Sequence, residues 1–186
     1  MIYVFLADGF EDLEAIAPID ILKRAKFNLK TVGIGGETIT STLGLVVKPD
    51  IEIESEEVNT QNLEAIVLPG GMPGTKNLDK CEKLHEIIKF CIKNEILIGA
   101  ICAAPMILGE MGMLQDRRAV CFPGCEPHMK GADILQDSIC KDGKIITARG
   151  PGVAVEFAFS LVTCLKGKSA TEIIKKSMQC SNNLNV

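Results

Sequence analysis

The sequence has little of what marks several common protein classes. It has only two histidines among 186 residues, and its formal net charge is −4. Lysine and arginine are scattered among acidic residues instead of forming a basic patch, which argues against nucleic acid as a main partner. No apolar run is long enough to cross a bilayer, so we expect no membrane-embedded segment.

The amino-terminal apolar segment, residues 2–7, is too short for a secretory signal, and no basic segment precedes it. We therefore expect a cytoplasmic protein. In that compartment the eight cysteines are free thiols and not a disulfide framework. Most of them should be core residues, and Cys91 and Cys164, for example, fall in helical apolar patterns.

Cofactor and metal motifs are also lacking. The glycine-rich segment at residues 69–74 fits neither the P-loop nor the dinucleotide-binding pattern. Cys121, Cys125 and His128 have irregular spacing and no obvious fourth ligand, which disfavours zinc. We expect neither a cofactor nor a metal.

Short apolar runs alternate with helical patterns along the whole chain. This alternation predicts an α/β fold, with a mostly parallel sheet and helices on both faces. With no repeat and no shift in composition, we expect a single domain over residues 1–180 and a polar tail at 181–186. The expected buried strands are residues 2–7, 29–34, 65–68 and 96–101, and the longer expected helices are about 11–26, 78–93 and 153–165.

The most informative segment is residues 96–105, where an apolar strand ends at Cys102. A helical pattern begins at once, from Ala103 to about Met113. So short a turn from strand to helix is strained and presents its residue at the edge of the sheet. At a helix N-terminus, free N–H groups would lower the pKa of the Cys102 thiol. The alternative interpretation is an ordinary buried cysteine.

Two other breaks, at residues 8–14 and 69–74, fall at the carboxyl ends of predicted parallel strands. In an open sheet these ends line the same crevice as Cys102. Backbone N–H groups of the glycine-rich loop, with that of Ala103, would form an oxyanion hole for a carbonyl group attacked by Cys102. A plain tight turn is the alternative for the loop.

Glu14 is the candidate acid–base group of this crevice. Pro18 removes a helical hydrogen bond to the carbonyl group of Glu14 and should distort the helix there. Since an ionised carboxylate would raise the pKa of a neighbouring thiol, the workable arrangement has Glu14 protonated and donating to sulfur. Alternatively, Glu11, Asp12 and Glu14 only complement the helix dipole. A histidine base is less favoured, because His128 fits a surface turn.

Four segments resemble the ThiJ/PfpI superfamily in order and spacing. They are DGFEDLE at 8–14, VLPGG at 67–71, AICAAP at 100–105 and TARGPG at 147–152. The resemblance runs from residue 1 to about 176, and its branch is that of the Parkinsonism-associated protein deglycase and bacterial ThiJ-like proteins. It implies a flavodoxin-like three-layer sandwich, related to class I glutamine amidotransferases, and a homodimer.

The resemblance also implies roles for particular residues. Cys102 corresponds to the oxidisable nucleophile and Glu14 to its protonated partner, while Gly71 and Ala103, with the adjoining Gly70, correspond to the oxyanion and substrate-binding positions. The implied function is glyoxalase or deglycase chemistry on a small aldehyde or glycated substrate, through a hemithioacetal on Cys102. The alternative is a redox sensor or chaperone whose Cys102 is oxidised to sulfinic acid.

Three departures from the family pattern bear on function. Phe122 stands where some members have a histidine near the nucleophile, and Leu43 or its neighbour replaces an arginine. Ala103 stands where the protease-like branch has histidine, which argues against peptidase activity. The H-x-E motif of amidotransferases is absent, which disfavours glutamine hydrolysis.

Overall fold

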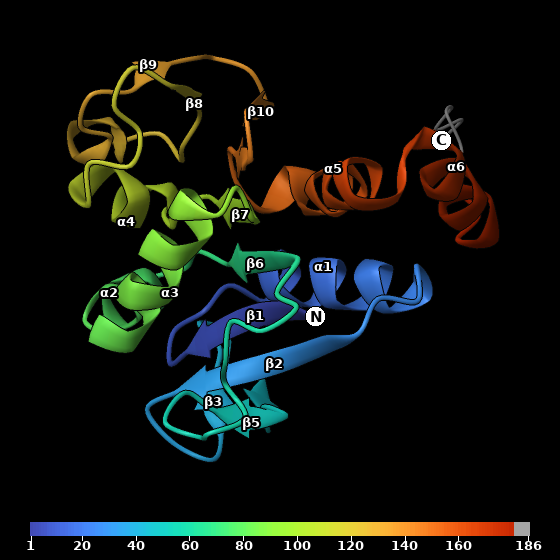
Figure 1. Cartoon of the computed structure of the whole chain (residues 1–186), viewed down its shortest axis with the longest axis horizontal. Helices are drawn as coiled ribbons and strands as arrows, with labels where there is room; N and C mark the ends of the chain where they lie inside the picture. Colours follow the sequence, from blue (N-terminus) through green and yellow to red (C-terminus); the bar gives the residue numbers. More distant parts are fainter. Residues whose placement is uncertain (181–186) are drawn as a thin grey trace.

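A seven-stranded sheet runs through the described part of the computed structural model, residues 1–180 (Figure 1). The strand order is β10-β11-β7-β6-β1-β2-β5. All neighbours are parallel except β10, which is antiparallel to β11. This is the mostly parallel sheet that the sequence predicts. The strands are β1 Ile2–Ala7, β2 Leu29–Ile34, β5 Ile51–Glu52, β6 Ala65–Leu68, β7 Leu97–Ile101, β10 Ile139–Asp142 and β11 Ile145–Ala148.

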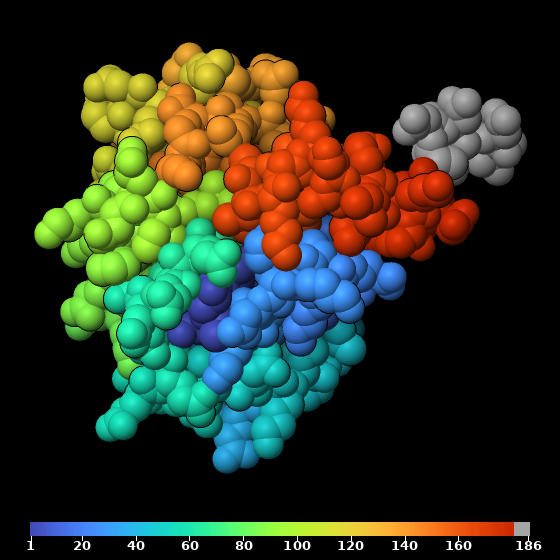
Figure 2. All heavy atoms as spheres, turned by 45° about the vertical axis from the view of Figure 1, so that its right-hand side comes forward, coloured from blue at the N-terminus to red at the C-terminus, as the bar shows by residue number. Residues whose placement is uncertain are grey.

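Helices cover both faces of this sheet. The connections β1–α1–β2 and β6–α2–α3–β7 run in opposite directions along the sheet, so right-handed crossovers place their helices on opposite faces. On one face α1 packs against α5, and α5 also contacts α6. In Figure 2 the orange-red segment of α5 and α6 lies against the blue amino-terminal segment, which includes α1. The helices are α1 Asp12–Arg24, α2 Gly74–Asp79, α3 Glu82–Lys93, α4 Pro105–Glu110, α5 Ala154–Lys166 and α6 Lys168–Ser177.

The core lies on the central strands, because every residue of β1, β6, β7 and β11 is buried. Such near-continuous apolar runs are typical of parallel strands covered on both faces. Gly99 in β7 shows how closely α5 packs on the sheet. A Cβ atom there would be 2.8 Å from the Leu161 side chain and 2.9 Å from the ring of Phe157, both in α5.

Smaller elements surround the carboxyl edge of the sheet. A small hairpin is formed by β3 (Ile39–Thr40) and β4 (Val46–Val47), and backbone hydrogen bonds join it to the turn between β1 and α1. A second small sheet pairs β8 (Arg118–Ala119) with β9 (Asp133–Ile134). Two short 3-10 turns lie at Glu126–His128, between β8 and β9, and at Pro151–Val153, after β11.

Several local predictions are wrong. The expected helix at 78–93 is two helices, α2 and α3, with a break at residues 80–81. The helix after Cys102 begins only at Pro105. Cys164 is exposed, because it lies off the apolar face of α5 and toward Lys141 and Lys144 of the neighbouring hairpin. Cys91, in contrast, is buried as predicted.

Some predictions remain open. The predicted tail at 181–186 lies outside the described residues, and the single domain stays a prediction. Within residues 1–180, no helix is both long enough and apolar enough to span a membrane.

Candidate active site

The predicted site residues come together at the carboxyl ends of three strands. Glu14 follows β1, Gly70 and Gly71 follow β6, and Cys102 and Ala103 follow β7. The chain passes from β1 to β2 on one side and from β6 to β7 on the other, so the crossovers diverge between β1 and β6. Such a switch point is where open α/β sheets bind ligands.

Cys102 occupies a strained turn. Its φ of +65° lies in the left-handed region, which non-glycine residues rarely adopt. The backbone is held from both sides: its N–H donates to the carbonyl oxygen of Ala148 at 2.8 Å, and its carbonyl oxygen accepts from the N–H of Phe122 at 2.8 Å. Because backbone groups of any residue type can make these bonds, no sequence signal foretold the roles of Ala148 and Phe122.

Gly70 occupies the space between the two candidate catalytic side chains. Its N–H donates to Oε2 of Glu14 at 2.8 Å. A Cβ atom on Gly70 would be 2.7 Å from that same oxygen, 2.8 Å from Cβ of Cys102 and 2.9 Å from the carbonyl oxygen of Ile101. Only glycine fits here, so its absent side chain is what lets Glu14 and Cys102 approach each other.

Glu14 differs from the two acidic residues that precede it. Glu11 caps α1, because its carboxylate accepts from the N–H of Glu14 at 2.8 Å, and Asp12 accepts from the Ser41 hydroxyl at 2.9 Å. Glu14 itself is fully buried, and its Oε1 has no hydrogen-bond partner among the described nitrogen and oxygen atoms. Burial raises its pKa to about 7, against the lowering effects of Cys102 and the N–H of Gly70.

Cys102 is 9% exposed, and the pKa of its thiol lies above the ordinary value. Burial is the main cause, followed by the charge of ionised Glu14, while the backbone N–H groups of Ala103 and Gly71 lower the pKa. A pKa lowered by a helix N-terminus was therefore a wrong prediction: α4 starts three residues later, and burial outweighs the N–H groups. Since each charge opposes the other, the carboxyl and thiol groups lose their protons one at a time.

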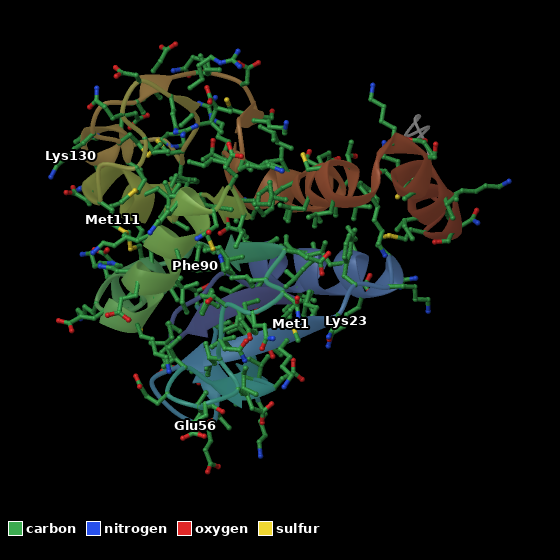
Figure 3. The ribbon with its side chains drawn as sticks, viewed as in Figure 1. Met1, Lys23, Glu56, Phe90, Met111 and Lys130 are labelled. Carbon is green, nitrogen blue, oxygen red and sulfur yellow. The ribbon has the colours of Figure 1, made fainter. Side chains whose placement is uncertain are left out.

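The two histidines lie away from this pair. Nε2 of His85 is 3.0 Å from Oδ1 of Asp79, and Nδ1 of His128 is 2.8 Å from Oε1 of Glu110. Glu110 also binds Lys130, which Figure 3 labels at the outer edge of the molecule. Among residues 1–180, no three His, Cys, Asp or Glu side chains are grouped to hold a metal ion.

Comparison with known proteins identifies the family. Residues 1–164 match the model of the DJ-1/PfpI family. Protein dj-1beta of Drosophila melanogaster is 30% identical, over 97% of both chains. The chain therefore belongs to the DJ-1/PfpI family, which confirms the resemblance found in the sequence.

Other relatives carry names of enzymes or are longer proteins. The glutathione-independent glyoxalase DJR-1.2 of Caenorhabditis elegans is 31% identical, over 90% of this chain and 89% of that protein. A deglycase of Pyrococcus abyssi is 32% identical, over 89% of this chain and 99% of that protein. Protein DJ-1 homolog B of Arabidopsis thaliana is 34% identical over 90% of this chain, which spans only 38% of that protein.

Solved structures confirm the flavodoxin-like α/β fold class. Drosophila melanogaster DJ-1beta superposes with a TM-score of 0.91 at 30% identity, covering 97% of each chain. Oxidized Toxoplasma gondii DJ-1 superposes with a TM-score of 0.90 at 30% identity, covering 96% of this chain and 97% of that one.

Proposed function

We propose that this protein is a cysteine-dependent enzyme acting on small reactive carbonyls, with glyoxalase or deglycase-like chemistry. The observation that carries the proposal is the pairing of Cys102, in a strained turn, with the buried carboxyl group of Glu14 across Gly70. The names of the nematode glyoxalase and the archaeal deglycase support the same reaction class.

The proposed reaction is redox-neutral within the substrate. The Cys102 sulfur adds to the aldehyde carbon of an α-oxoaldehyde and forms a hemithioacetal, whose oxyanion would face the backbone N–H groups of Gly71 and Ala103. A proton then moves from the aldehyde carbon to the neighbouring carbonyl carbon through an enediol, giving a thioester of a 2-hydroxy acid. Water cleaves the thioester and restores the thiol.

Glu14 suits the proton transfers in this scheme. A group with a pKa of about 7 is partly protonated at neutral pH and can both donate and accept a proton. When protonated it can donate to the thiolate, and when ionised it can remove the proton from the hemithioacetal carbon. No histidine is needed in this arrangement.

The test is methylglyoxal consumption with lactate formation in the absence of glutathione. We expect turnover by the wild type, loss in Cys102→Ser and a fall of about 100-fold or more in Glu14→Gln. Cys91→Ser, at a buried cysteine of α3, is the matched control and should retain activity. Absent wild-type turnover, or activity retained in Cys102→Ser, would contradict the proposal.

The oxidized Toxoplasma gondii relative favours one alternative, a redox sensor or chaperone in which peroxide converts Cys102 to sulfenic and then sulfinic acid. Mass spectrometry after graded peroxide distinguishes it. Two results together would support the redox sensor or chaperone: glyoxals are not turned over, and Cys102 is the first of the eight cysteines to be oxidised. Cys164, which is exposed, is the internal comparison.

We also propose a homodimer, supported by a group of exposed apolar side chains. Leu13 and Ile16 on α1 are 58% and 40% exposed, and Leu45 and Val46, in the hairpin of β3 and β4, are 44% and 60% exposed. Light scattering should give twice the mass of the 186-residue chain, and Ile16→Lys should reduce it to one chain.

A further inference from the structure

Two exposed apolar residues, Phe122 and Met72, belong to segments whose backbone contacts Cys102 from either side. On the β11 side, the ring of Phe122 packs over Gly150, where a Cβ atom would be 3.2 Å from a ring carbon. Phe122 remains 45% exposed, although its N–H bonds the carbonyl oxygen of Cys102. On the β6 side, Met72 follows Gly71 directly and is 44% exposed.

Among residues 1–180, no cationic side chain is a main influence on the pKa of the Cys102 thiol. The groups that shift the pKa of Cys102 are Glu14 and the backbone N–H groups of Ala103 and Gly71, besides burial itself. Arg149 adjoins Gly150, but its Nη1 donates to the carbonyl oxygen of Gln136 at 2.9 Å. A substrate with a carboxylate or phosphate group would therefore meet the acidic side chain of Glu14, and no cation of the described residues acts on the Cys102 thiol itself.

We propose, on the basis of the function above, that this site selects α-oxoaldehydes with an apolar, especially aromatic, substituent over hydroxylated or anionic ones. The aldehyde carbon lies at the Cys102 sulfur, and the substituent on the adjacent carbonyl carbon lies between Phe122 and Met72. Contact with an aromatic ring removes apolar surface of both partners from water, whereas a hydroxyl group at that position loses its hydration without gaining a partner.

The experiment compares kcat/KM for phenylglyoxal, methylglyoxal and hydroxypyruvaldehyde, the last being methylglyoxal with one added hydroxyl group. We expect phenylglyoxal to exceed methylglyoxal by about tenfold, and methylglyoxal to exceed hydroxypyruvaldehyde. Phe122→Ser and Met72→Ser should each reduce the preference for phenylglyoxal several-fold. Ile173→Ser, at a 68% exposed apolar residue on α6, is the matched control and should keep the wild-type ratio.

Either of two results would overturn the proposal. One is equal kcat/KM for phenylglyoxal and hydroxypyruvaldehyde, and the other is an unchanged preference for phenylglyoxal in both Phe122→Ser and Met72→Ser. If none of the three aldehydes is turned over, the proposed function fails, and protection of Cys102 from iodoacetamide then tests the preference separately. Phenylglyoxal should protect at about one tenth of the methylglyoxal concentration in the wild type, and less effectively in Phe122→Ser. Equal protection by both aldehydes would refute it.

Discussion

Replacing Gly70 with alanine should separate the Glu14 carboxyl group from the Cys102 thiol. The added Cβ atom would meet three atoms within 2.9 Å, closer than real Cβ contacts allow. Two of them cannot rotate away, because the carbonyl oxygen of Ile101 is backbone and Cβ of Cys102 is fixed in the strained turn. The third, Oε2 of Glu14, can move only by losing its 2.8 Å hydrogen bond to the backbone of residue 70.

Overpacking of this kind costs about 1–3 kcal/mol of unfolding free energy. Because two rigid atoms are involved, we expect about 2–3 kcal/mol for Gly70→Ala in urea denaturation. Displacing Glu14 by about 1 Å should also lower methylglyoxal kcat/KM by about 100-fold. Gly152→Ala is the matched control: it has open space where the Cβ atom would lie, so its stability should change by less than about 0.5 kcal/mol.

If Gly70→Ala is as stable as Gly152→Ala and turns over methylglyoxal at the wild-type rate, then Gly70 is not needed to bring Glu14 and Cys102 together. Loss of activity with unchanged stability would instead mean that the loop moves as a unit and carries Gly71 away from Cys102. Alkylation of Cys102 by iodoacetamide separates these outcomes, since a displaced Glu14 changes the pH at which the thiol reacts.

Two further predictions concern Glu14. Its pKa is raised from 4.5 to about 7 in the folded protein, so the folded state keeps a proton that the unfolded state releases between these values. The unfolding free energy should therefore fall by about 3 kcal/mol as pH rises from 4.5 through 7, and urea titrations of Glu14→Gln should lack this decline. Glu14→Leu, which removes the ionised carboxylate that opposes the thiolate, should lower the pKa of the Cys102 thiol in the pH dependence of alkylation; an unchanged or raised pKa would mean that Glu14 stabilises the thiolate as a hydrogen-bond donor.

The sequence by itself determined much of the fold, because the relevant signals are local. An apolar run such as residues 2–7, with no polar alternation, fits a strand buried on both faces, and the structure confirms it. The inward face of α3, with Leu84, Ile88 and Cys91 buried, follows from the 3.6-residue period. Cys102 was singled out in the same way, by an apolar strand that stops at a cysteine.

Which acidic residue joins the site was decided by tertiary structure. Pro18 and the family resemblance pointed to Glu14, but the alternative that Glu11, Asp12 and Glu14 all complement the helix dipole stayed open. Their separate roles as cap, hydroxyl partner and buried acid depend on what each side chain meets. The same holds for Cys164, whose helical pattern resembles a core position although it faces lysines. Periodicity tells which face of a helix a residue occupies but not which element covers that face.

The site itself also required the strand order. Residues 14, 70 and 102 are far apart along the chain, and they meet only because β6 lies between β1 and β7 in the sheet. Met72 lies in the glycine-rich loop and Phe122 at a position that departs from the family pattern, but neither observation places them on opposite sides of Cys102. Local sequence fixes the period and polarity of each element, whereas distances between elements follow from the packing of the whole sheet, because contacts between distant segments form only when the entire core closes.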